Sequence, residues 1–226
     1  NNSFNKKNKK VLLSGYKGFF AFFFCFFLFS TSFLFPLVLM LKWSLMNSSY
    51  LDLNQILQLN YNSIKLIFLS SIFIILTSLI VTFSGRVLKS KILSFFSSLS
   101  ISGYAMPGIV VSVSVISLFS LIDSFLDMNL RGYFIGSIYG LIFGYSVRFY
   151  SISFNTIKTV YLKINKSIDE SALLLGFNKL SILKNVHYPL LKKNLIFAFI
   201  LISIEVIKEL PITLILRPFN FETFST

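Results

Sequence analysis

The sequence predicts an all-α protein that crosses a membrane several times as a helical bundle. Three observations carry this prediction: 55% of the 226 residues are hydrophobic, only 13% are charged, and the apolar residues gather in long stretches. Soluble domains carry about 25% charged residues. A stretch of about 20 apolar residues is long enough to cross the hydrocarbon core of a bilayer as a helix. A disordered chain is therefore excluded, and an ordinary soluble domain is not expected.

Five stretches have the length and composition of membrane spans. In chain order they cover residues 18–41, 64–83, 101–122, 132–157 and 194–216. A basic segment precedes the first stretch, as in a signal peptide, but its length and the lack of a small-residue cleavage site favour a span. We expect residues 1–226 to be one transmembrane domain and a fragment of a longer protein.

The distribution of positive charge predicts the orientation of these spans. With the N-terminus in the cytoplasm, most of the 21 Lys and Arg residues fall on the inner side, including the clusters within 6–10 and 158–193. Positively charged segments between spans tend to stay in the cytoplasm. The net charge of +13 is thus explained by membrane topology, and we expect the lipid bilayer, rather than nucleic acid, as its surroundings.

The longest inner loop, residues 158–193, is predicted to form two short helices joined at a glycine. The local signals are a capping box of Ser167 and Glu170, a left-handed stop at Gly176, an N-cap at Asn178 and a helix end at Pro189. His187 is the only histidine, so a multi-histidine metal site is excluded, and we expect no catalysis from it.

The same loop resembles the coupling motif of ABC-transporter permeases. The matching positions are Glu170, Ser171, Ala172, Gly176, Val186, Tyr188 and Pro189, and their spacing fits throughout. Ser171, Val186 and Tyr188 replace the Ala, Ile and Leu of the motif. The resemblance implies that the loop docks onto a cytoplasmic ATPase, and the chain has no glycine-rich phosphate loop with which to bind ATP itself. An ordinary helix-turn-helix loop is the alternative.

Residues 205–219 are similar to a stretch in the second half of ferric-iron ABC permeases, and residues 103–108 also resemble that family. The resemblance implies a MetI-like permease half, with its final span missing, in a bacterial cytoplasmic membrane. It also implies that the chain is not an enzyme and binds no cofactor. The implied partners are an ATPase dimer, a periplasmic iron-binding protein and a homologous permease half. The alternatives are the same transporter for thiamine, sulfate or molybdate and, in a different class, a passive channel or a structural membrane subunit.

Three ionisable residues lie close together in the last predicted span. Glu205, Lys208 and Glu209 are three and four positions apart, so a continuous helix would place them on one face. Charges inside a span are costly and turn toward the bundle interior or a wet cavity. The predicted substrate path or outer gate comprises Glu205, Lys208, Glu209, Pro211, Thr213 and Arg217. Glu205 and Glu209 are the candidate ligands of a hard cation; a structural ion pair is the alternative.

Glycine recurs at every fourth residue in the fourth predicted span, at Gly132, Gly136, Gly140 and Gly144. Small residues at this spacing let helix backbones approach closely. We therefore expect this stripe to pack against a neighbouring helix, with pore lining as the alternative. Arg148 is expected near the inner end of the same span, where its long side chain can reach the interface.

Overall fold

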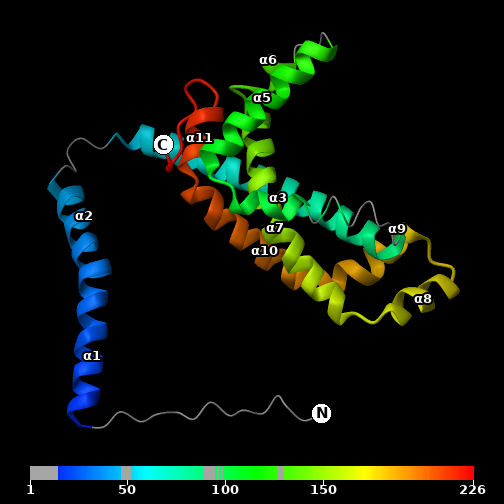
Figure 1. Cartoon of the computed structure of the whole chain (residues 1–226), viewed down its shortest axis with the longest axis horizontal. Coiled ribbons are helices and arrows are strands. Elements are labelled where there is room, and N and C mark those ends of the chain that lie inside the picture. Colours follow the sequence, from blue (N-terminus) through cyan, green and yellow to red (C-terminus); the bar gives the residue numbers. More distant parts are fainter. Residues whose placement is uncertain (1–14, 47–51, 89–94, 96, 98, 127–129) are drawn as a thin grey trace. The chain divides into compact units, whose positions relative to one another are not determined.

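The computed structural model describes residues 15–46, 52–88, 95, 97, 99–126 and 130–226. Within these residues all regular structure is helical and no strand occurs, so the all-α prediction is confirmed. The chain divides into two compact units, Asn1–Leu53 and Asn54–Thr226, and each is described by itself (Figure 1).

The first unit contains one long apolar rod. It is made of α1 (Tyr16–Phe29), the π-helical turn η1 (Ser30–Leu34) and α2 (Phe35–Met46). Pro36 follows the π-helical turn and has no N–H for the regular helical hydrogen bond, which accounts for the irregularity there. The rod spans 31 residues, its most apolar 18-residue stretch has a mean hydropathy of 2.2, and it contains the first predicted span. A helix that is apolar all round belongs in lipid or among other helices.

Two further helices of the described residues are long and apolar enough to cross a membrane: α3 (Leu53–Leu88) and α5 (Gly108–Leu126). The second predicted span lies within α3. The prediction that the third begins at residue 101 is wrong, because a short 3-10 turn, η3 (Ser102–Ala105), comes first and Met106 is extended. Pro107 steers the residue before it away from helical geometry, so α5 begins only at Gly108.

The fourth predicted span is interrupted rather than continuous. It divides into α6 (Leu130–Phe134) and α7 (Ile138–Lys163), with Gly136 between them at a φ of +70°. Ser137 caps α7, and its hydroxyl accepts a hydrogen bond from the Gly140 N–H at 3.2 Å. A left-handed glycine followed by a serine cap is a strong helix-start signal, which overrides the apolar periodicity.

The last predicted span also contains a break. Helix α10 (Tyr188–Lys208) ends before Glu209, whose backbone is extended, and α11 (Leu210–Leu216) follows. Pro211 lies in the first turn of α11, where its missing N–H costs nothing. By length and composition α7 and α10 are not among the three candidate spans of the described residues, so only three of the five predicted spans have this support.

Pro189 does not end a helix, which corrects the prediction for the inner loop. Helix α9 (Lys179–Ile182) passes through the π-helical segment η4 (Leu183–His187) directly into α10, and Pro189 lies in the first turn of α10. The wider hydrogen bonding of the π-helical segment accommodates Pro189, which has no backbone N–H to donate. The inner loop is thereby joined to α10 without an intervening coil.

Helix α7 lies at the centre of the second unit. Its Leu141, Tyr145 and Phe149 are at most 1% exposed and pack with buried side chains of α3, α5, α10 and α11. Figure 1 shows α7 and α10 running side by side, with α8 (Lys166–Leu174) and α9 at one end of the pair. Smaller apolar clusters fasten that end, one of them joining Phe83 of α3 to Ala172 and Ile182.

Candidate functional site

The bend between α8 and α9 is built by local backbone hydrogen bonds. Gly176 has a φ of +84°, its N–H donates to the Leu173 carbonyl at 3.0 Å, and the Phe177 N–H donates to the Ala172 carbonyl at 3.1 Å. This pair of hydrogen bonds is the Schellman arrangement, which requires a left-handed residue. The predicted stop at Gly176 is therefore confirmed.

The N-terminal cap of α8 differs from the prediction. The Asn165 side chain, not that of Ser167, accepts the capping hydrogen bond, from the Ser167 N–H at 3.2 Å. Ser167 already lies inside the helix, so the predicted capping box with Glu170 is wrong. The predicted cap at Asn178 is confirmed, since its side-chain oxygen accepts from the Ser181 N–H at 2.7 Å.

The bend presents apolar side chains outward. Four leucines around Gly176 are largely exposed: Leu173 at 53%, Leu174 at 90%, Leu175 at 77% and Leu180 at 75%. We call these four residues the leucine group. Exposed apolar side chains gathered on one short segment are typical of a surface that another protein covers.

The other residues of the predicted coupling motif divide into two sets. Ala172 is buried and Val186 packs against the same cluster, so both attach the loop to α3. Glu170, Ser171 and Pro189 are exposed. The motif therefore includes both anchoring positions and positions that are open to contact.

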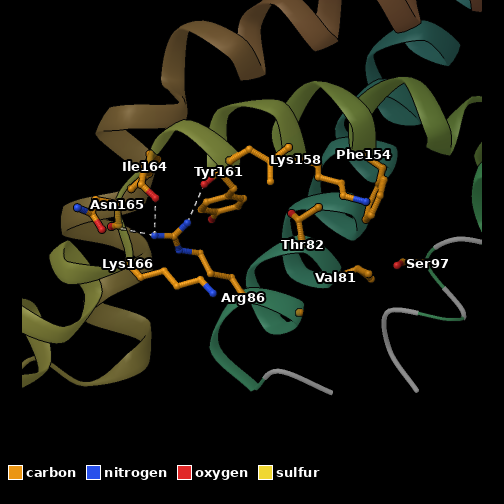
Figure 2. Close-up of a pocket in the computed structure, with 12 residues that line it drawn as sticks. Val81, Thr82, Arg86, Ser97, Phe154, Lys158, Tyr161, Ile164, Asn165 and Lys166 are labelled. Atoms are coloured by element: carbon orange, nitrogen blue, oxygen red, sulfur yellow. Dashed lines mark hydrogen bonds between the residues drawn. The ribbon is translucent and has the colours of Figure 1, made fainter. Parts of the chain in front are cut away.

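Arg86, at the end of α3, fastens the loop to the rest of the unit. Its Nε donates to Oδ2 of Asp169 in α8 at 2.6 Å, and Nη1 donates to the Tyr161 carbonyl at 2.8 Å. Nη2 donates to the carbonyls of Ile164 and Asn165, both at 3.1 Å (Figure 2). A cation at the C-terminus of α7 also compensates the helix dipole. Sequence reasoning counted Arg86 only as a topology charge, because its partners are distant in the chain.

His187 occupies the interior of this joint. It is fully buried, its Nε2 lies 2.9 Å from Oδ1 of Asp169, and its ring packs against those of Phe83 and Tyr161. The Nε2 contact is at ion-pair distance without the alignment of a hydrogen bond. Asp169 thus lies between two basic groups, and His187 has a structural position that the sequence did not indicate.

The stability of this joint should fall in mild acid. Burial lowers the pKa of His187 below its ordinary value of 6.5, with Asp169 opposing and Arg86 reinforcing the shift. Above pH 6.5 the imidazole is neutral in both the folded and the unfolded chain. Below pH 6.5 the unfolded chain takes up a proton on His187, whereas the folded chain resists that proton. The free energy of unfolding therefore decreases as the pH falls. Limited proteolysis measures this loss of stability, and we expect the loop to be cleaved faster at about pH 5.5 than at about pH 7.5. A His187→Phe variant with the same acid sensitivity would contradict it.

A second candidate site is a buried ion pair between α7 and the break before α11. Arg148 Nη1 lies 2.7 Å from Oε1 of Glu209, and the Glu209 side chain is 6% exposed. The same carboxylate oxygen accepts from the Ile212 N–H at 3.3 Å and so caps α11. Gly108 makes room for the pair, since a Cβ there would collide with both charged groups. The pair therefore joins α7, the α10–α11 break and the start of α5.

The predicted cluster of Glu205, Lys208 and Glu209 is divided by the break. Lys208 pairs with Glu205 at 3.0 Å, and their side chains are 60% and 28% exposed. Glu209 leaves the helix and faces Arg148 instead, so the expectation of one shared helix face is wrong.

The remaining residues of the predicted gate have separate partners. The Thr213 hydroxyl donates to the Glu209 backbone carbonyl. Its oxygen lies 2.6 Å from the hydroxyl oxygen of Tyr145. Arg217 is 4.0 Å from Glu222, and Pro211 lies beside Gly108. Among the described residues no group of three or more His, Cys, Asp or Glu side chains converges as a metal site. The two candidate ligands each face a cation instead, Glu205 facing Lys208 and Glu209 facing Arg148.

Arg148 does not lie near an inner helix end, which corrects the prediction for this residue. Helix α7 continues to Lys163, which places Arg148 about 22 Å from that end at 1.5 Å per residue. The Arg148 side chain is largely buried here, and Glu209 supplies its carboxylate partner.

The four spaced glycines do not form one packing stripe. Gly132 belongs to α6 and Gly136 to the turn, while a Cβ at Gly140 would collide with the Phe134 carbonyl oxygen. A Cβ at Gly144 would lie 2.9 Å from Leu216 Cδ1 of α11. Gly140 therefore lets α6 fold back, and Gly144 serves a contact with the non-adjacent helix α11.

Fold and sites together define a helical protein in which three long apolar helices are consistent with a membrane location. No protein-family model matches the chain, and no curated protein matches it either.

Proposed function

We propose that this chain is one half of the membrane-spanning permease of an ATP-driven ABC importer. Its loop, residues 158–193, docks onto a cytoplasmic ATPase dimer, and a homologous permease half completes the pathway. The single observation that carries this proposal is the leucine group, held outward at the bend around Gly176. A passive channel has no need of an apolar docking surface on a stiff inner loop, so the importer is favoured.

The way the loop is attached suits the transmission of force. Arg86 and Asp169 link α8 to the end of α3, and η4 continues directly into α10. A displacement of α8 by an ATPase would therefore be passed to two long helices at once. In an alternating-access cycle those helices would re-pack around the pathway, and the Arg148–Glu209 pair lies where such a movement would act as a gate.

Ferric iron, delivered by a periplasmic binding protein, is the proposed substrate, on the resemblance of residues 103–108 and 205–219. Thiamine, sulfate and molybdate are the alternatives within the same class of transporter. The bacterial cytoplasmic membrane follows as the proposed location. Metal uptake by cells with and without the full-length gene distinguishes these substrates.

Disrupting the leucine group should separate the permease from its ATPase. We expect a variant with Leu174→Asp and Leu180→Asp to accumulate in the membrane and to lose ATPase co-purification, because charges replace the apolar contact. Lys184→Asp, an exposed change on the same loop, is the matched control and should retain the ATPase. Undiminished co-purification of the double variant would contradict the docking role.

Gly176→Val should weaken coupling through backbone strain alone. A Cβ at Gly176 meets no heavy atom within 4 Å, but valine resists a φ of +84°. We expect normal insertion, a distorted bend and reduced ATPase co-purification. Gly176→Asn is the control, since asparagine tolerates the left-handed region and should retain coupling. Equal behaviour of the two variants would show that the left-handed geometry is unimportant.

A further inference from the structure

We propose that a pocket beside the loop binds the phosphate group of an anionic phospholipid. The pocket has a volume of about 520 Å³ and lies between the last turns of α3, the last turns of α7 and the start of α8 (Figure 2). The proposal rests on the membrane topology of the proposed function, in which this end of α3 and α7 is cytoplasmic.

The lining of the pocket changes from apolar to basic along the helices. Val81 of α3 and Phe154 of α7 form an apolar part of the lining, about one helical turn before Arg86 and Lys158 along the two helices. Because the apolar span of α3 ends at Val87, this order matches the change from acyl chain to headgroup at a membrane surface. Basic pockets between helices on the cytoplasmic side are suited to anionic headgroups.

Among the described residues that line the pocket, two lysines supply positive charge for a ligand. Lys158 comes from α7 and Lys166 from the first residue of α8, so they reach the pocket from different walls (Figure 2). Both are exposed, and neither has a carboxylate within ion-pair distance among the described residues. Lys158 Nζ lies 5.3 Å from the centre of the Phe154 ring, which keeps the ammonium group over the apolar wall.

The positions of Lys158 and Lys166 are not explained by the needs of Arg86 or by the stability of α8. The hydrogen bonds of Arg86 go to Asp169 and to carbonyls at the end of α7, so it neutralises that helix end and leaves the ligand to the lysines. A positive charge at the first residue of a helix opposes the helix dipole, so Lys166 is not placed there to stabilise α8. A soluble phosphate would leave Val81 and Phe154 uncovered, whereas a lipid's glycerol and first acyl carbons would cover them.

The test uses the full chain in mild detergent and native mass spectrometry with phosphatidylglycerol or phosphatidylcholine. We expect preferential retention of phosphatidylglycerol. In the double variant with Lys158→Gln and Lys166→Gln, the preference for phosphatidylglycerol over phosphatidylcholine should fall. The expected decrease is about fivefold for each lysine removed, as for basic residues at an anionic surface. The matched control is Lys163→Gln with Lys179→Gln, two exposed lysines outside the pocket, and it should keep the preference.

An equal loss in the control, or equal retention of the two lipids by the unmodified chain, would overturn the proposal. Inorganic phosphate is the second arm: it should not displace phosphatidylglycerol, and full displacement would assign the pocket to a soluble anion and overturn the lipid. ATPase co-purification is measured on the same samples. Selective retention of phosphatidylglycerol without any ATPase partner would contradict the proposed function and leave the lipid site intact. ATPase binding without lipid selectivity would contradict the lipid site and leave the proposed function intact.

Discussion

Arg148→Met should destabilise the protein by about 3–5 kcal/mol, the usual cost of removing one member of a buried ion pair. Glu209 is a buried residue, so the change leaves its carboxylate in a buried place with its cation gone, and Gly108 packs so closely that little room remains for a substitute. The expected result is poor accumulation in the membrane and a lowered unfolding temperature in detergent. Glu209→Gln should be milder, because the amide oxygen can still cap α11.

Combining Arg148→Met with Glu209→Gln should recover most of the lost stability, since no uncompensated charge is left buried. The control removes the exposed pair by Glu205→Gln with Lys208→Gln, and it should change stability by less than about 1 kcal/mol. A double variant no more stable than Arg148→Met would contradict the pairing. If the pair is also part of the gate, the double variant will accumulate and still fail to transport iron.

Gly103→Ala should destabilise the contact between η3 and α7 by an amount near the upper end of the ~1–3 kcal/mol range for overpacking. A Cβ at Gly103 would collide with the backbone carbonyl of Val147, and a backbone atom of a central helix cannot move aside as a side chain can. Thermal unfolding in detergent measures the effect.

Gly85→Ala is the matched control for that experiment. Gly85 lies inside α3, and a Cβ at this position would have no heavy atom within 4 Å, so alanine there should be neutral or should stabilise the helix by about 1 kcal/mol. Equal destabilisation by the two substitutions would mean that loss of glycine in general, rather than the contact with Val147, is responsible.

The features that the sequence predicted correctly depend on a few adjacent residues. The apolar stretch within α3 makes a long helix because its residues are compatible with helical geometry and too apolar for water. The stop at Gly176 and the cap at Asn178 were also correct, since each motif is closed by hydrogen bonds that reach no more than five residues along the chain.

Predictions failed where two local signals competed. Ser167 and Asn165 both suit an N-cap, and in the folded chain the Asn165 side chain makes the capping hydrogen bond. Likewise the apolar pattern across Gly136 and across Glu209 was compatible with unbroken helices. The signals for the breaks, a left-handed glycine with the Ser137 cap and an extended Glu209 that caps α11, compete with that pattern, and both α6 and α11 pack against α5 in the folded chain.

The sequence by itself determined that the chain is helical, that its long helices are apolar and that the segment between α8 and α9 bends at a glycine. Only the tertiary structure decided the electrostatic pairs, because Arg148 and Glu209 are 61 positions apart and Arg86 and Asp169 are 83 apart. Charges in an apolar bundle must find partners, but which partner each finds depends on where the helices break and which faces meet. The sequence grouped Glu209 with its neighbours Glu205 and Lys208, and one extended residue was enough to turn it toward Arg148.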